Sequence, residues 1–218
     1  MDMILDDMEV RILGCLMEKE MTTPEYYPLS LNALINACNQ KSNRNPVVSF
    51  EESAVAHGLQ LLQEKGLARK THSAGSRVPK YLHAILDQFD LSRREMAVLC
   101  ELLLRGPQTV GELRPHVERM SVFESLGEAE KSMQVLVEHN PPLAIRLPRE
   151  PGRKECRYMH LFSGEVGTEK AGYELPDEKS APQKGALEKI IRLELEVARL
   201  RRELEELKQA FLLFKSQF

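Results

Sequence analysis

Apolar residues recur at helical spacing in three segments before Gly66. They predict a helix that begins at Asp6, a short helix capped by Ser30, and a third helix that stops at Gly66. Their inward-facing positions are Val10, Leu13, Leu16 and Met17, then Leu31, Leu34, Ile35 and Cys38, then Val55, Leu59 and Leu62. Residues 67–73 (LARKTHS) and 81–86 (YLHAIL) predict two strands joined by a loop.

The same order of elements returns between residues 91 and 163. Three further helices are predicted, followed by a hairpin from residues 143–149 (LAIRLPR) and 156–162 (CRYMHLF). Four of the predicted helices begin with an S/T-x-x-E capping box, in which two backbone amides are satisfied reciprocally. These boxes are Ser49 with Glu52, Ser92 with Glu95, Thr109 with Glu112, and Ser125 with Glu128.

Three helices followed by a hairpin are typical of a winged helix-turn-helix. The predicted fold class is therefore mainly α with small β-hairpins, as two tandem winged helix-turn-helix domains and a C-terminal coiled-coil helix. We place domain 1 at 1–90, domain 2 at 91–163, a flexible linker rich in Gly and Pro at 164–186, and the coiled-coil helix at 187–218.

The tail carries an unbroken heptad pattern of apolar residues, with 3-4 spacing throughout. These dimerisation candidates are Ile190, Leu193, Val197, Leu200, Leu204, Leu207, Phe211 and Phe214. Parallel pairing of two tails matches opposite charges at the flanking positions, namely Lys189 with Glu194, Glu196 with Arg201, and Glu203 with Lys208. The pattern therefore predicts a parallel homodimer. The alternative is an amphipathic helix that packs on its own chain.

Composition excludes several classes of protein. No apolar run approaches the ~20 residues of a membrane span, and acids at the N-terminus exclude a signal peptide, so we expect a cytoplasmic protein that does not bind membranes. The four cysteines (Cys15, Cys38, Cys100 and Cys156) lack a CxxC pair and favour reduced thiols over a zinc site. The sequence contains no GxSxG, P-loop, GxGxxG or HExxH motif. We therefore expect a non-enzymatic protein without cofactor or metal.

Two segments carry the candidate chemistry. Residues 39–46 (NQKSNRNP) form an unusually long connection between the second and third helices, and contain amides and cations but no acid. Such groups donate hydrogen bonds to phosphates or to a partner's carbonyls. The alternative is a turn in which Asn and Ser side chains bond their own backbone. The nucleic-acid-binding candidates in this segment are Asn39, Gln40, Lys41, Asn43 and Arg44.

The predicted first hairpin and its loop, residues 66–83, contain no acid at all. Its candidate phosphate-binding residues are Arg69, Lys70, Arg77 and Lys80. Residues 41–80 hold seven bases against three acids, although the net charge of the chain is −3. A basic face of this kind favours double-stranded DNA as the partner.

The predicted third helices argue against DNA binding. Each begins with acids, Glu51 and Glu52 in one and Glu128 and Glu130 in the other, and acids repel phosphates. Neither helix offers the Arg, Asn or Gln cluster that reads base edges. The primary hypothesis is a DNA-binding or transcription-associated protein. The alternative is a protein-interaction module that uses the winged helices and the coiled coil to bind another protein.

Three strings identify a family resemblance: LDDMEVRILGCLMEKE near the start, ACNQKSNRNPV at 37–47, and GSRVPKYLH at 75–83. They closely resemble the YceH family of uncharacterised bacterial proteins. The resemblance covers residues 1–163, and implies a tandem winged-helix fold and a bacterial source. It brings no established activity, ligand or catalytic residue with it.

Overall fold

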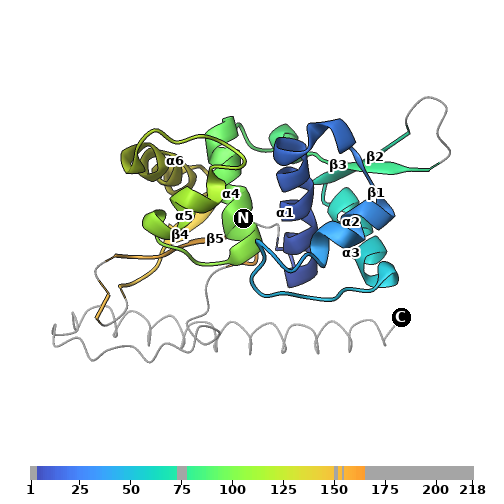
Figure 1. Cartoon of the computed structure of the whole chain (residues 1–218), viewed down its shortest axis with the longest axis horizontal. Coiled ribbons are helices and arrows are strands. Elements are labelled where there is room, and N and C mark those ends of the chain that lie inside the picture. Colours follow the sequence, from blue (N-terminus) through green and yellow to red (C-terminus); the bar gives the residue numbers. More distant parts are fainter. Residues whose placement is uncertain (1–3, 73–77, 150–151, 154, 165–218) are drawn as a thin grey trace, which may run out of the picture. The chain divides into compact units, whose positions relative to one another are not determined.

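The computed structural model describes residues 4–72, 78–149, 152–153 and 155–164 (Figure 1). This part of the chain is mainly helical, with six α-helices and two small antiparallel sheets. The predicted coiled-coil segment, its homodimer contacts and most of the 164–186 linker lie outside the described residues.

The first half of the described chain contains three helices and a three-stranded sheet. Its elements are α1 (Asp7–Thr22), a 3-10 helix (Pro24–Tyr26), β1 (Leu29–Ser30), α2 (Leu31–Cys38), α3 (Glu52–Glu64), β2 (Ala68–Thr71), β3 (Lys80–His83) and a second 3-10 helix (Ile85–Asp87). The sheet has the order β1-β3-β2. The two-residue strand β1 was not predicted from the sequence, because two residues are too few to show an alternating pattern.

The second half repeats the order with a smaller sheet. Its elements are α4 (Arg93–Arg105), α5 (Val110–Val117), α6 (Leu126–Glu138), β4 (Ala144–Arg146) and β5 (Tyr158–His160). Gln108 forms an isolated bridge to Tyr158 on the outer side of β5, in the place that β1 takes in the first half. The two hairpins are shorter than their predicted segments, and residues 85–87 form a 3-10 turn where a strand was predicted.

Most predicted helix starts are confirmed. Ser30 caps α2, and full capping boxes open α4 at Ser92 and α5 at Thr109. At α6, Ser125 accepts from the Glu128 amide as predicted, whereas the Glu128 carboxylate bonds the Glu124 amide.

The predicted Ser49–Glu52 capping box is wrong. The helix α3 has Glu51 at its N-cap and no side-chain cap bond. The chain is held there by a longer-range contact, because the Asn39 side chain donates to the Phe50 carbonyl at 2.8 Å and accepts from the Phe50 amide at 2.7 Å.

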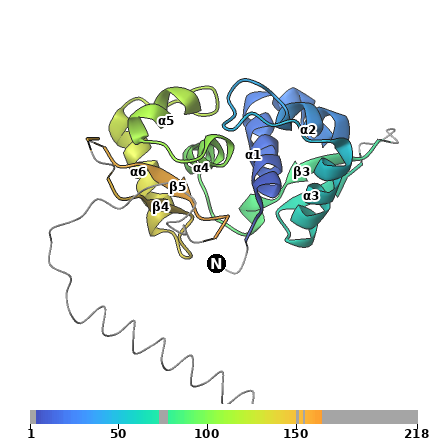
Figure 2. The same ribbon diagram turned by 90° about the horizontal axis from the view of Figure 1, so that it is seen from below.

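The first helices of the two halves, α1 and α4, pack directly against each other (Figure 2). Gly14 permits this approach, since a Cβ at that position would lie 2.9 Å from Leu104 Cδ2 and 3.2 Å from Leu103 Cβ. The Cys100 thiol donates to the Gly14 carbonyl at 3.3 Å. Buried residues of both halves form a single continuous core.

We predict that Gly14→Leu lowers the free energy of unfolding by about 1–3 kcal/mol, because the added side chain overpacks the α1–α4 contact. Urea denaturation of the full chain measures the change. Gly111→Ala is the matched control, since a Cβ at Gly111 meets nothing closer than 3.5 Å. A Gly14→Leu protein as stable as the control would show that the helices do not pack this closely.

Candidate nucleic-acid interface

The connection between α2 and α3, residues 39–51, is held by internal hydrogen bonds. Gln40 donates to Ser42 Oγ at 3.0 Å and accepts from Lys19 at 3.3 Å. Together with the Asn39–Phe50 pair, these bonds favour the alternative of a self-bonded turn over a loop that offers its donors to a partner. Lys41 is exposed on this connection.

Arg44 is not on the surface. Its side chain and that of Glu18 are both fully buried, with Arg44 Nη1 and Nη2 donating to the two Glu18 carboxylate oxygens at 3.0 and 2.6 Å. The remaining Arg44 donors bond the Ala37 and Asn43 carbonyls, so all five N–H groups are used. The expectation that Arg44 contacts phosphate is therefore corrected, because its guanidinium is buried and paired with the Glu18 carboxylate.

The same connection attaches the first half to α4 of the second half. The Asn45 amide donates to the Leu104 carbonyl at 3.0 Å, and Arg105 Nη2 donates to Asn43 Oδ1 at 2.9 Å. The predicted candidate Asn43 is thus already bonded within the chain. Asn43 and Asn45 therefore help to join the two halves, whereas Arg44 bonds groups within the first half.

A buried ionic network continues from Glu18 into the second half. Arg119 forms ion pairs with both Glu18 and Glu101, the second at 3.3 Å. Glu101 also forms an ion pair with Arg105, whose Nε lies 2.9 Å from the Glu101 carboxylate. Burial disfavours the charged form of Glu18, but the hydrogen bonds and charge of Arg44, with the charge of Arg119, hold its pKa at about 2. For Glu101 burial prevails over Arg119 and Arg105, and its pKa is raised.

Sequence reasoning missed this network entirely. One signal was present, because α1 is apolar on nearly every side around Ile12, Leu13 and Leu16 and is buried accordingly. A carboxylate on such a helix must find a cation within the fold. The identity of that cation could not be read locally, since Arg44 and Arg119 lie 26 and 101 residues from Glu18.

The first hairpin, β2–β3, keeps its basic side chains at the surface. Antiparallel pairing sets Arg69 opposite Leu82 and Thr71 opposite Lys80, so Arg69 and Lys80 share one face while Lys70 lies on the other. Arg69 and Lys70 are exposed and Lys80 is half-buried. Arg69 pairs with Asp87, and both side chains are largely exposed, so this ion pair is weak. Arg77 lies outside the described residues.

The candidates therefore do not form a single patch. Figures 1 and 2 place the 39–51 connection at the junction of the two halves and the β2–β3 hairpin at the outer end of the first half. Of the predicted residues, Lys41 is part of the 39–51 connection, whereas Arg69, Lys70 and Lys80 lie on the hairpin.

The outward faces of α3 and α6 offer little for reading bases. Gln60 on α3 donates to Glu64 at 2.9 Å, and Gln134 on α6 donates to Glu138 at 2.6 Å. Glu51 and Glu52 are exposed at the start of α3. Gln60 and Gln134 are therefore each held beside a carboxylate and offer less to base edges.

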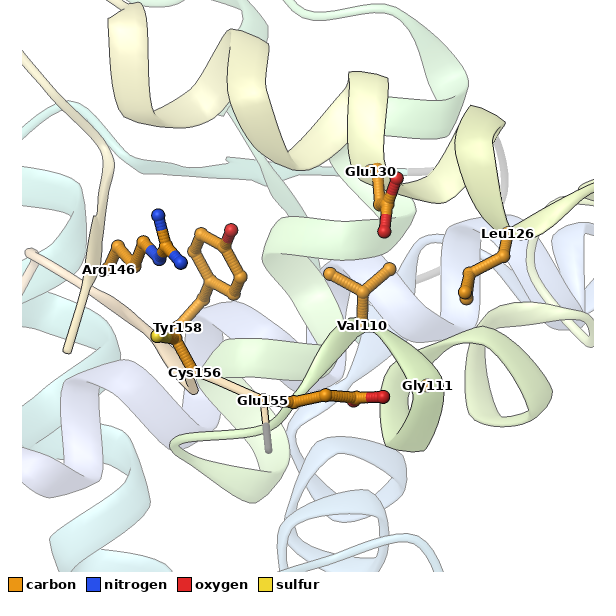
Figure 3. A pocket seen from close by; sticks show the side chains of 8 residues that line it. All are labelled: Val110, Gly111, Leu126, Glu130, Arg146, Glu155, Cys156 and Tyr158. Carbon is orange, nitrogen blue, oxygen red and sulfur yellow. The ribbon is translucent and has the colours of Figure 1, made fainter. Parts of the chain in front are cut away.

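The second half contains an open cavity of about 230 Å³ between the starts of α5 and α6 and the β4–β5 hairpin (Figure 3). It is lined by Val110, Gly111, Leu126, Glu130, Arg146, Glu155, Cys156 and Tyr158. A hydrogen bond from Arg146, with further support from the Arg146 charge and from Arg149, lowers the pKa of the Cys156 thiol. Cys15, Cys38 and Cys100 are buried in the core.

Comparison with known proteins places the chain in a family. The family described as "Protein of unknown function, DUF480" matches residues 5–153. The chain belongs to this family. The UPF0502 protein GSU0233 of Geobacter sulfurreducens is 50% identical over the full length of both chains. A UPF0502 protein of Geotalea uraniireducens is 53% identical, also over the full length of both.

A third relative, the UPF0502 protein Acid345_3645 of Koribacter versatilis, is 58% identical over 74% of this chain and 75% of its own. These matches confirm the resemblance to an uncharacterised bacterial family. Within the described part of this DUF480 chain, no helix is both long enough and apolar enough to span a membrane.

Proposed function

We propose that this DUF480 protein is a non-enzymatic, cytoplasmic DNA-binding protein built on two tandem winged helices. The main support is the acid-free β2–β3 hairpin, which projects from the outer end of the first half and carries Arg69, Lys70 and Lys80. The repeated order of three helices and a hairpin supports the winged-helix assignment. Such a hairpin lies along the phosphate backbone of a duplex.

Binding is expected to be dominated by the backbone and weakly selective for sequence. Acids at the start of α3 oppose its deep insertion into a groove, and Gln60 is already bonded to Glu64. Phosphate contacts carry no sequence information by themselves, but they make affinity strongly dependent on salt.

We predict that the double variant Arg77→Ala/Lys80→Ala weakens binding to all duplexes alike. The slope of log affinity against log salt should flatten by roughly two units, about 0.9 for each phosphate that is no longer neutralised. Fluorescence anisotropy with several unrelated duplexes measures this. Thermal stability should change little, and a binding curve identical to that of the wild type would exclude these side chains as phosphate ligands.

We also propose that the heptad tail forms a parallel homodimer. Light scattering of the full chain should give twice the chain mass, and deletion of residues 187–218 should halve it. A monomeric full-length chain, or a mass per particle that still corresponds to two chains after the deletion, would contradict the coiled coil.

A protein-interaction module is the second candidate function. It is favoured by exposed apolar side chains around the start of α6, where Val122 is 69% and Leu126 is 40% exposed beside the cavity and several acids. This surface fits an amphipathic, basic protein segment better than a nucleic acid. A pull-down with the Leu126→Ser variant as the comparison distinguishes this function, since that change should leave duplex binding intact.

A further inference from the structure

The second hairpin, with the loop between its strands, is also basic, although the sequence analysis gave it no role. Residues 143–163 contain five bases and two acids. The bases are Arg146, Arg149, Arg153, Lys154 and Arg157, and the acids are Glu150 and Glu155. This segment occupies the same place in the second half as the acid-free hairpin does in the first.

Arg146 and Arg149 are both exposed at the end of β4 and just beyond it. Arg146 and Cys156 line the same cavity, and both guanidinium groups act on the Cys156 thiol, whose pKa they lower. The two exposed guanidinium groups give this end of the hairpin a positive charge, with which the lowered pKa of the thiol agrees. An anion that approaches the hairpin from solvent meets the same two guanidinium groups.

The carboxylates near this hairpin are either paired with another cation or lie away from Arg146. Glu112 is engaged by Arg157, at 3.1 and 3.2 Å. Glu130 and Glu155 point into the cavity from opposite walls, with Val110 between them, whereas Arg146 lies at the other end beside Tyr158 (Figure 3). The cation end of this region is therefore distinct from its carboxylate end.

The two hairpins belong to different halves, one on each side of the α1–α4 contact (Figures 1 and 2). The helices α1 and α4 lie at the centre, β2–β3 packs on α1 and α3, and β4–β5 packs on α4 and α6 (Figures 1 and 2). The bonds from Asn45 and Arg119 across the junction fix the halves to each other. Each hairpin consequently faces its own region of solvent.

We propose that Arg146 and Arg149 form a second phosphate-backbone site, so that one chain holds two separate duplex segments, one at each hairpin. This proposal rests on the proposed DNA-binding function, and adds that the second half binds independently of the first. A chain of this kind bridges duplexes without needing a second copy of itself.

Alkylation of Cys156 tests the site without any substitution. The full-length chain is treated with iodoacetamide, with and without a 12-bp duplex, and Cys156 modification is followed by mass spectrometry. At a free duplex concentration of ten times Kd, the fraction of chains with an empty second site falls about elevenfold. We expect the alkylation of Cys156 to slow by about the same factor. The buried Cys15, Cys38 and Cys100 serve as internal indicators of unfolding.

The stoichiometry of duplex binding provides a second readout. At concentrations well above Kd, the wild-type chain is expected to bind two 12-bp duplexes per chain. Arg146→Ala/Arg149→Ala should bind one, and Lys70→Ala/Lys80→Ala should also bind one while keeping Cys156 protected. Arg94→Ala/Lys131→Ala removes the same charge from exposed positions outside both hairpins, and should still bind two.

The outcomes separate the two proposals. An absence of duplex binding by the wild type overturns the proposed function and this inference together. One duplex per wild-type chain, with Cys156 alkylated at its free rate, overturns the second site alone. Protection of Cys156 by poly-glutamate but not by duplex would assign the hairpin to an acidic protein instead, and would overturn the duplex site.

Discussion

Replacement of Arg44 by alanine is expected to lower the free energy of unfolding by about 3–5 kcal/mol, because it leaves a buried carboxylate without its main partner. Both side chains of the Arg44–Glu18 pair are fully buried, and the pair holds the Glu18 pKa at about 2. Arg119 is the other guanidinium that pairs with Glu18, and it also serves Glu101. Urea denaturation of the full chain gives the change.

The double variant Glu18→Met/Arg44→Met is the matched control. It removes both charges and keeps side-chain volume, so it should recover much of the stability that Arg44→Ala loses. Lys41→Ala removes an exposed cation from the same connection and should change stability by less than about 0.5 kcal/mol. If the Arg44→Ala chain were as stable as the Lys41→Ala chain, the buried Arg44–Glu18 pair would be contradicted. Arg44 would then have to lie at the surface, where it could contact phosphate.

The buried His160 is expected to contribute a loss of stability of about 3 kcal/mol as pH decreases from 6.5 to 4. His160 on β5 is only 6% exposed, and burial lowers its pKa from the ordinary 6.5 to about 4. A histidine with a depressed folded-state pKa takes up its proton in the unfolded chain first. Its contribution is therefore fully present above pH 6.5, and is lost as pH falls toward 4.

The variant His160→Gln tests this pH dependence, since glutamine does not titrate. The urea midpoint of the wild type should fall more steeply between pH 7.5 and pH 4.5 than that of the variant. Glu18 affects stability only below pH 4.5, because the stability that its carboxylate contributes is lost as pH falls from its ordinary pKa to about 2. Glu101 acts in both proteins alike. Parallel pH profiles for the two chains would contradict the assignment to His160.

Local chemistry explains which structural features could be predicted from sequence. The boxes at Ser92 and Thr109 formed as predicted, since each needs only a residue three positions away. The Ser49 box did not form, because Asn39 fixes the Phe50 backbone from 11 residues away. A local rule gives way where a longer-range contact fixes the neighbouring backbone.

The candidate site residues that could be predicted from sequence are likewise those whose signal is local. The hairpin bases were found because the absence of acids from residues 66–83 is a local property of the sequence, and Arg69 and Lys70 are exposed as expected. Arg44 was misplaced because its partner Glu18 sits one helix away, in a stripe that otherwise predicts only apolar packing. Arg44 and Asn45 of the 39–51 connection donate to α1 and α4, which no spacing rule within the connection reveals.

Salt-dependent binding of duplex DNA tests the central claim most directly. The affinity of the full-length chain for a 30-bp duplex of random sequence is measured by fluorescence anisotropy at 50 and 200 mM salt. With two phosphate contacts at a hairpin, affinity should fall by roughly tenfold across this range, and to a similar extent for unrelated sequences. An absence of binding at 50 mM salt, or an affinity that does not change with salt, would contradict the assignment of this protein to nucleic-acid binding.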